Sequence, residues 1–179
     1  CIGESFVDGE IRVGQREPVD IVFREATFQI KMMLGGRQPG VVWRDRQRLY
    51  RNAKGLNDPK HPVVRPWTPP IPISFADAVE AVARELAGYV SHYGGSAGCS
   101  TIDALVYVNL EERYLWPTEP ELPAHVADEL NAQGWRSVSM LFIPYGVVLT
   151  AGTNAPKFLR SRVGQVLNQW PGTDWFDAP

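Results

Sequence analysis

The sequence predicts a single mixed α/β domain with a central sheet and flanking helices, and three observations point to this class. The 179-residue chain is 44% hydrophobic and 21% charged, as expected for an ordinary globular protein. Segments with strand and helix periodicity are interspersed along it. No apolar run approaches the roughly 18 to 20 residues of a membrane helix, so we expect one domain over residues 1–179 and no membrane partner.

Cysteine usage and the first residue bear on location. The chain has two cysteines, Cys1 and Cys99, which cannot build a disulfide framework, so a cytoplasmic location is expected. The chain begins with Cys1 rather than methionine, which leaves open whether another segment precedes it.

The first third of the chain predicts a meander of three strands. Residues 10–13 alternate weakly, residues 19–23 are rich in β-branched side chains, and residues 27–32 alternate polar with apolar at a period of two. Three such segments joined by short connections are expected to pair with one another in order.

The second connection decides which side chains meet. If Arg24 and Glu25 form a two-residue turn, residues whose numbers sum to 49 lie opposite one another, and Asp20 faces Gln29. Gln29 and Lys31 share one face of their strand because side chains alternate. A loop of a different length by one residue would change this pairing, so the alternative stays open.

Residues 34–73 form an insert rich in glycine, proline and arginine, which predicts a partly irregular segment. Within it, residues 41–54 can form a short helix with arginines on one face. Residues 37–65 hold eight basic and two acidic side chains, a local charge of +6 that leaves −8 for the rest of a chain whose total is −2. A nucleic-acid partner is therefore compatible with the nearly neutral total.

The remaining elements follow from periodicity and end signals. A Ser74 cap predicts the longest helix, which Gly94 should end. Residues 94–98 match G-x-S-x-G, but they lie between a helix and a strand, the reverse of a nucleophile elbow, so we expect a loop. The later predictions are a buried strand over 104–110, a helix over 123–133, a hairpin of 138–143 with 147–151, and a closing helix over 158–170.

Asp20, Gln29 and Lys31 carry the clearest chemistry. An acid, an amide oxygen and an ammonium on one site suit a hard cation such as Mg²⁺ bound beside a phosphodiester. The lysine could position or deprotonate the attacking water and offset charge in the transition state. The structural alternative for the same residues is the polar face of a half-buried strand.

At these residues the sequence resembles the PD-(D/E)XK nucleases, the restriction-endonuclease-like superfamily. Its signature is an acid on one strand and an acid-x-lysine on the next, represented here by Asp20 and by Gln29-Ile30-Lys31. The superfamily core runs helix, three-strand meander, helix, strand, which is similar to the layout of residues up to about 110. The sequence thus resembles a bacterial family of proposed endonucleases, with a core over about 1–110, the basic insert 34–73 and an α-β-β-α extension over about 111–179.

The resemblance implies a metal-dependent hydrolase that cuts DNA phosphodiester bonds, with Mg²⁺ or Mn²⁺ as cofactor and RNA as the alternative partner. Asp20 and Gln29 would hold the metal, and Lys31 would assist the attack of water. The first helix of the superfamily often supplies a further acid, for which Glu4 is the first candidate and Glu10 the second. Basic side chains of the insert would grip the nucleic-acid backbone, namely Arg37, Arg44, Arg48, Arg51 and Lys54.

One departure from the signature keeps two other functions open. Gln29 stands where the superfamily has an acid, which removes one negative charge from the site. The second hypothesis is therefore a catalytically inactive module that binds nucleic acid or protein. In the third, the apolar C-terminal third serves to form a homodimer and the arginine face is ordinary surface.

Overall fold

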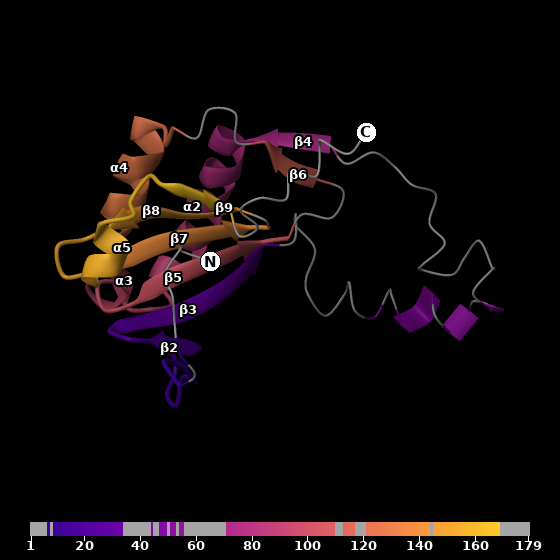
Figure 1. The fold of residues 1–179 in the computed structure, drawn as a ribbon, viewed down its shortest axis with the longest axis horizontal. Coiled ribbons are helices and arrows are strands. Elements are labelled where there is room, and N and C mark those ends of the chain that lie inside the picture. The colour runs from indigo at the N-terminus through magenta and orange to yellow at the C-terminus, as the bar shows by residue number, and fades with distance from the viewer. Residues whose placement is uncertain are drawn as a thin grey trace.

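The computed structural model describes residues 7, 9–33, 44, 47–49, 51–52, 54–55, 71–109, 113–116, 121–143 and 145–168. In these ranges a central seven-stranded sheet carries helices on both of its faces (Figure 1). The predicted mixed α/β class is confirmed. No helix in the described part of the chain is long and apolar enough to span a membrane.

The sheet is mixed, with parallel strands at its centre and antiparallel strands on both sides. The parallel strands are β3, β5 and β7, and the chain crosses between them through helices on one face. Across the sheet the strands are β1 (Ile11–Val13), β2 (Ile21–Phe23), β3 (Ala26–Met33), β5 (Asp103–Val108), β7 (Ser137–Phe142), β8 (Tyr145–Ala151) and β9 (Val166–Asn168).

The meander of β1, β2 and β3 forms as predicted, including its register. Phe23 pairs with Ala26, and Ile21 pairs with Phe28, so paired residue numbers sum to 49. Arg24 takes a φ of 52° in the two-residue turn, which lets the strands reverse direction within so short a connection. Its guanidinium lies 4.8 Å from the centre of the Phe23 ring.

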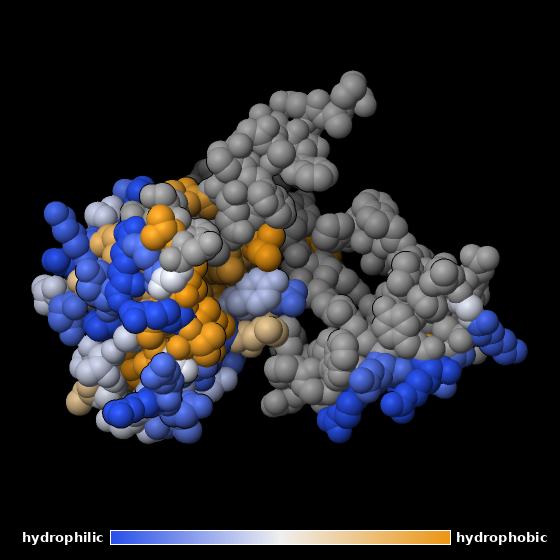
Figure 2. Space-filling view, turned by 60° about the horizontal axis from the view of Figure 1, so that its bottom comes forward, coloured by the Kyte–Doolittle hydropathy of each residue, from blue (hydrophilic) through white to orange (hydrophobic). Residues whose placement is uncertain are grey.

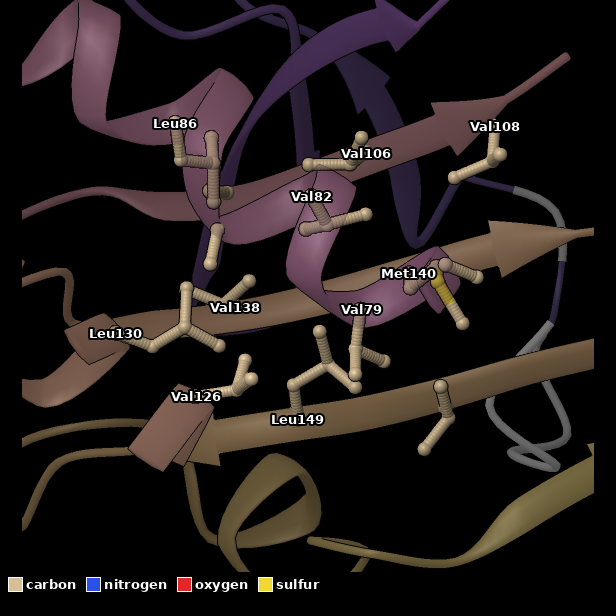
Figure 3. Packing of buried hydrophobic residues seen from close by; sticks show 14 of the residues in the cluster. Val79, Val82, Leu86, Val106, Val108, Val126, Leu130, Val138, Met140 and Leu149 are labelled. Carbon is tan, nitrogen blue, oxygen red and sulfur yellow. The ribbon is translucent and has the colours of Figure 1, made fainter. Parts of the chain in front are cut away.

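The larger core lies between the sheet and two helices, α2 (Phe75–Val90) and α4 (Ala124–Gln133). The hydroxyl of Ser74 accepts a hydrogen bond from the Asp77 backbone N–H at 3.0 Å, so the predicted cap starts α2. Gly134 ends α4 with a φ of 80°. Figure 3 shows the apolar side chains packed here, among them Val79, Val82, Leu86, Val106, Val126, Leu130 and Met140.

A smaller cluster covers part of the opposite face under α5 (Lys157–Arg160). Phe28 and Val148 of the sheet pack there with Leu159, and Phe158 stacks edge-on against Phe23 with ring centres 5.5 Å apart. The sheet is therefore buried on both sides near its middle strands.

Three predictions about elements are wrong. The closing helix over 158–170 is limited to α5, because Gly164 takes a φ of 75° and the chain then enters β9, which pairs with β8. The expected loop over 94–98 contains a helical turn, α3 (Gly95–Cys99), and α2 already ends at Val90.

The end of the insert contains a strand that was not predicted from the sequence. This strand, β4 (Ile71–Ser74), pairs in parallel with β6 (Arg113–Trp116) in a two-stranded sheet. Each strand is short and its partner is distant in the chain, so no local pattern revealed them. Residues 44, 47–49, 51 and 52 are helical, in agreement with the predicted helix, and the rest of 34–70 lies mostly outside the described residues.

The first residues of the three parallel strands are joined by one buried carboxylate. Asp103 is fully buried, and its Oδ1 accepts hydrogen bonds from Arg136 Nε at 3.0 Å and Ser137 Oγ at 2.7 Å. Its Oδ2 accepts from the Thr27 backbone N–H at 2.9 Å and from Arg136 Nη2. One side chain thus holds β3, β5 and β7 together, as a buried charge must be paired and hydrogen-bonded.

Removal of the Arg136 guanidinium should destabilise the fold strongly. Arg136→Met leaves the Asp103 carboxylate buried beside two neutral donors, so the free energy of unfolding should fall by about 3 kcal/mol. Urea denaturation of both proteins measures this change.

The matched control is Arg84→Met on the exposed side of α2, which should change stability by less than about 0.5 kcal/mol. Equal effects of the two substitutions would contradict the role given to Asp103.

Candidate functional site

The structure brings Asp20 and Gln29 into direct contact. Asp20 lies just before β2, and its Oδ2 accepts hydrogen bonds from Gln29 Nε2 and from the Ile30 backbone N–H at 2.7 Å. The Asp20 backbone N–H in turn donates to the Phe28 carbonyl at 2.9 Å. The pairing predicted from a two-residue turn therefore places the acid and the amide side by side.

Gln29 is a buried polar side chain with one unused group. Only 6% of its surface is exposed, and its Oε1 has no hydrogen-bond partner among the described residues. Burial of an amide oxygen without a partner costs free energy, so such groups are uncommon in native proteins. Packing alone therefore does not explain why a buried amide stands at position 29.

Lys31 follows on the same face of β3, under the last turns of α2. Its Nζ lies 4.4 Å from the ring centre of Tyr89 and 5.2 Å from that of Tyr93. Among the described residues no carboxylate lies within ion-pair distance of this ammonium. The half-buried charge thus lies over two aromatic rings, and no acid in the described part of the chain pairs with it.

Both tyrosines are held by further contacts. The Tyr89 hydroxyl donates to Glu85 Oε1 at 3.3 Å. Tyr93 packs edge-on against the buried Trp135, with ring centres 5.6 Å apart. Trp135 Nε1 donates to Gln133 Oε1 at 3.0 Å, and Gln133 Nε2 donates to a carbonyl of α2 at 2.9 Å. These contacts hold the two rings that lie near Lys31 in place.

Sequence reasoning assigned Tyr89 and Tyr93 only to the apolar side of a helix. Their i, i+4 spacing is what a core-facing helix shows, and nothing local links them to Lys31. The contact exists only because α2 and the turn after it pack on the sheet face that carries the Lys31 side chain of β3.

Burial raises the pKa of Tyr89, and the neighbouring Glu85 carboxylate raises it further. The positive charge of Lys31 acts in the opposite direction and lowers it. Tyr89 therefore stays a neutral phenol beside the ammonium at ordinary pH.

Glu10 is used elsewhere. Its Oε2 accepts from the Val7 backbone N–H at 2.9 Å, and its Oε1 pairs with Arg24 Nε at 3.2 Å. The Val7 hydrogen bond and then Arg24 lower the pKa of Glu10. It thus fastens the chain to the hairpin turn. Glu4, the first candidate for the additional acid, lies outside the described residues.

The predicted backbone-binding residues are placed in part. Arg44, Arg48 and Arg51 are helical at i, i+4 and i+7, which puts them on one helix face, and all three are exposed, as is Lys54. Figure 2 shows hydrophilic side chains gathered along one side of this segment, at the right of the view. Arg37 lies outside the described residues.

The described residues contain no group of three or more His, Cys, Asp or Glu side chains that could hold a metal ion. Asp20 and Gln29 could offer one carboxylate and one amide oxygen. A site with so few protein ligands would depend on water and substrate oxygens for the rest, as Mg²⁺ commonly does.

A sequence model of one protein family matches residues 2–174, and the family is described as "Putative endonuclease, protein of unknown function (DUF1780)". The chain belongs to this family. The predicted kinship with an endonuclease family is thereby supported at the level of that description. No curated protein matches the sequence.

A solved structure shares the fold of this DUF1780 member. It is a protein of unknown function from Pseudomonas aeruginosa strain PAO1, described as belonging to the monooxygenase superfamily. The TM-score is 0.66 and the identity 22%, over 96% of this chain and 76% of that one. At this identity the match establishes the mixed α/β architecture and no activity.

The raised pKa of Tyr89 makes stability depend on pH in alkaline solution. Folding raises the pKa of the Tyr89 phenol above its ordinary value of about 10, so the neutral phenol stabilises the folded state below about pH 10. This stabilisation is lost as the pH rises through the raised pKa. Phenolate absorbance during a pH titration, compared between wild type and Tyr89→Phe, should show one tyrosine that ionises late.

Tyr107→Phe, on the other face of the sheet, serves as the control variant. Ionisation of Tyr89 at or below the ordinary tyrosine pKa would contradict its burial beside Glu85.

Proposed function

We propose that this DUF1780 chain is a metal-dependent endonuclease that hydrolyses DNA phosphodiester bonds at a site built from Asp20, Gln29 and Lys31. One observation carries the proposal: the acid and the amide are in contact, and an ammonium unpaired with any described acid follows on the same strand face. The family description as endonucleases supports the same reaction class.

The topology also supports a restriction-endonuclease-like core. The meander of β1, β2 and β3 is followed by α2 and then by β5, which lies parallel to β3. This is the order of meander, helix and strand that the sequence resemblance implies. The contact between Asp20 and Gln29 falls on the first hairpin of that arrangement.

The donor set fits a weakly bound Mg²⁺ or Mn²⁺. Gln29 Oε1 is a buried oxygen that no described residue hydrogen-bonds, next to the Asp20 carboxylate. An amide can present either its oxygen or its N–H₂ group to a neighbour. Asp20 and Gln29 would hold the ion, with Glu4 as a possible third ligand. When bound, the ion would polarise the phosphoryl oxygen of the substrate.

The other residues act on the substrate by charge. The Lys31 ammonium offsets negative charge that builds up on the phosphoryl group, and its fixed position means that it need not reorganise during the reaction. Arg37, Arg44, Arg48, Arg51 and Lys54 contact the phosphates of the nucleic-acid backbone, DNA in the first instance and RNA as the alternative.

A second candidate function is a nucleic-acid-binding module that has lost catalysis. It is favoured by the neutral Gln29, whose amide donates a hydrogen bond to Asp20 and thereby occupies the carboxylate. Metal binding would be weak with one acid, while the basic segment would retain its affinity for phosphates.

Cleavage of plasmid DNA in Mg²⁺ or Mn²⁺ tests the first function. Lys31→Ala should lower the single-turnover rate by about 10²- to 10⁴-fold, because the transition-state charge loses its cation. Lys157→Ala, on exposed α5 at the opposite sheet face, should cut like wild type.

Metal-dependent cutting that survives Lys31→Ala would overturn the assignment of this lysine. A wild-type protein that binds DNA with a steep salt dependence and never cuts it would favour the second function.

Gln29→Glu tests whether the site binds metal at all. Two adjacent carboxylates repel, so the variant should melt below wild type in EDTA, and Mn²⁺ should then stabilise it more than wild type. A tenfold gain in affinity corresponds to an additional rise in Tm of about 3 to 6 °C at saturating metal.

Gln165→Glu, an exposed amide outside the site, controls for the added charge. An equal metal response in all three proteins would exclude Asp20 and position 29 as ligands.

A further inference from the structure

We infer that Tyr89 and Tyr93 are positioning residues for Lys31, and that their rings fix its ammonium where a phosphoryl oxygen of the substrate binds. This inference rests on the proposed endonuclease function. It adds Tyr89 of α2 and Tyr93 of the turn that follows α2 to a site that the sequence placed entirely on the β2–β3 hairpin.

The geometry is that of a cation over two aromatic rings. Lys31 Nζ is 4.4 Å from the Tyr89 ring centre and 5.2 Å from that of Tyr93, both within the range of about 6 Å over which a ring attracts a cation. Tyr89 lies in the last turn of α2 and Tyr93 in the turn directly after it, where the Tyr93 backbone N–H donates to the Tyr89 carbonyl at 3.2 Å. The lysine has a flexible four-carbon stem that would otherwise sample many positions.

Aromatic faces suit a cation that must act on an anion. A carboxylate would hold Lys31 equally well but would neutralise it, and the ammonium would then offer little to a phosphate. A ring attracts the cation without removing its charge or occupying its N–H donors in full. The absence of a described carboxylate partner for Lys31 agrees with this role.

Both tyrosine side chains are held in place by further contacts, as a positioning role requires. Glu85 accepts the Tyr89 hydroxyl, and the buried Trp135 packs edge-on against Tyr93. Trp135 is itself fixed through Gln133 to a carbonyl of α2. Precise placement matters because a misplacement of about 1 Å can cost about 10²-fold in rate.

The experiment separates the ring from the hydroxyl in single-turnover DNA cleavage. Tyr89→Phe keeps the ring and should retain the wild-type rate within about threefold. Tyr89→Leu and Tyr93→Leu each remove one ring and should lower kcat by about 3- to 30-fold with little change in KM. The control is Tyr107→Leu, a half-buried tyrosine on the other sheet face, which should cut like wild type.

A double variant shows whether the ring acts through the lysine. In the Lys31→Ala background, Tyr89→Leu should cost no further rate, since the group that it positions is already absent. Additive losses, or equal losses in Tyr89→Phe and Tyr89→Leu, would overturn the inference in favour of simple packing.

A measurement without DNA tests the contact of the two tyrosines with Lys31 separately from the proposed endonuclease function. Amine labelling followed by mass spectrometry should modify Lys31 more slowly than the exposed Lys157, and Tyr89→Leu should speed the labelling of Lys31 alone. If Tyr89→Leu leaves the labelling rate of Lys31 unchanged, the positioning role of Tyr89 is wrong, while the endonuclease proposal stands. If Lys31 of the wild-type protein is protected from labelling but the protein cuts no DNA, the proposed function is wrong. The positioning of Lys31 by the two tyrosines then has no catalytic role.

Discussion

The buried carboxylate of Asp103 is the constraint on which the rest of the structure depends. It receives hydrogen bonds from both ends of the Arg136 fork, from Ser137 and from the Thr27 backbone, so the starts of β3, β5 and β7 are tied at one level. Register follows, with Phe28 level with Asp103 and Asp103 level with Ser137. With β3 fixed in this way, Lys31 comes to lie against Tyr89 at the end of α2 and against Tyr93 in the following turn.

The sequence allowed the local half of this arrangement to be predicted and hid the other half. The hairpin register depends on one short turn, and the side-chain period of two then decides that Asp20 meets Gln29. The hydrogen bonds of Asp103 and the contacts of Lys31 with the two tyrosines join residues far apart in the chain. The periodicity of a short sequence segment cannot reveal such contacts. The wrong closing helix has a local cause, since Gly164 turns the chain into a strand that only β8 could specify.

Charge links the proposed chemistry to the composition. A nearly neutral total conceals a positive insert and a negative remainder, and that remainder contains Asp20. At the proposed site, a neutral Gln29 beside Asp20 would carry less negative charge than a second acid, which would weaken the attraction for a cation and also the repulsion of a phosphate. Such a site would exchange some metal affinity for easier approach of an anion. The balance would be set by one side chain, whose oxygen is buried without a partner in the described part of the chain.

The two-residue turn at Arg24 and Glu25 has an evolutionary consequence. One residue inserted there would shift the register of β2 against β3 by one position and turn Asp20 to the other face of the sheet, away from Gln29. The loop between β1 and β2 carries no such requirement for the pair. Relatives that keep the same chemistry should therefore keep the number of residues in this turn, so that the spacing between the acid and the lysine is more constrained than the amino-acid identity at position 25.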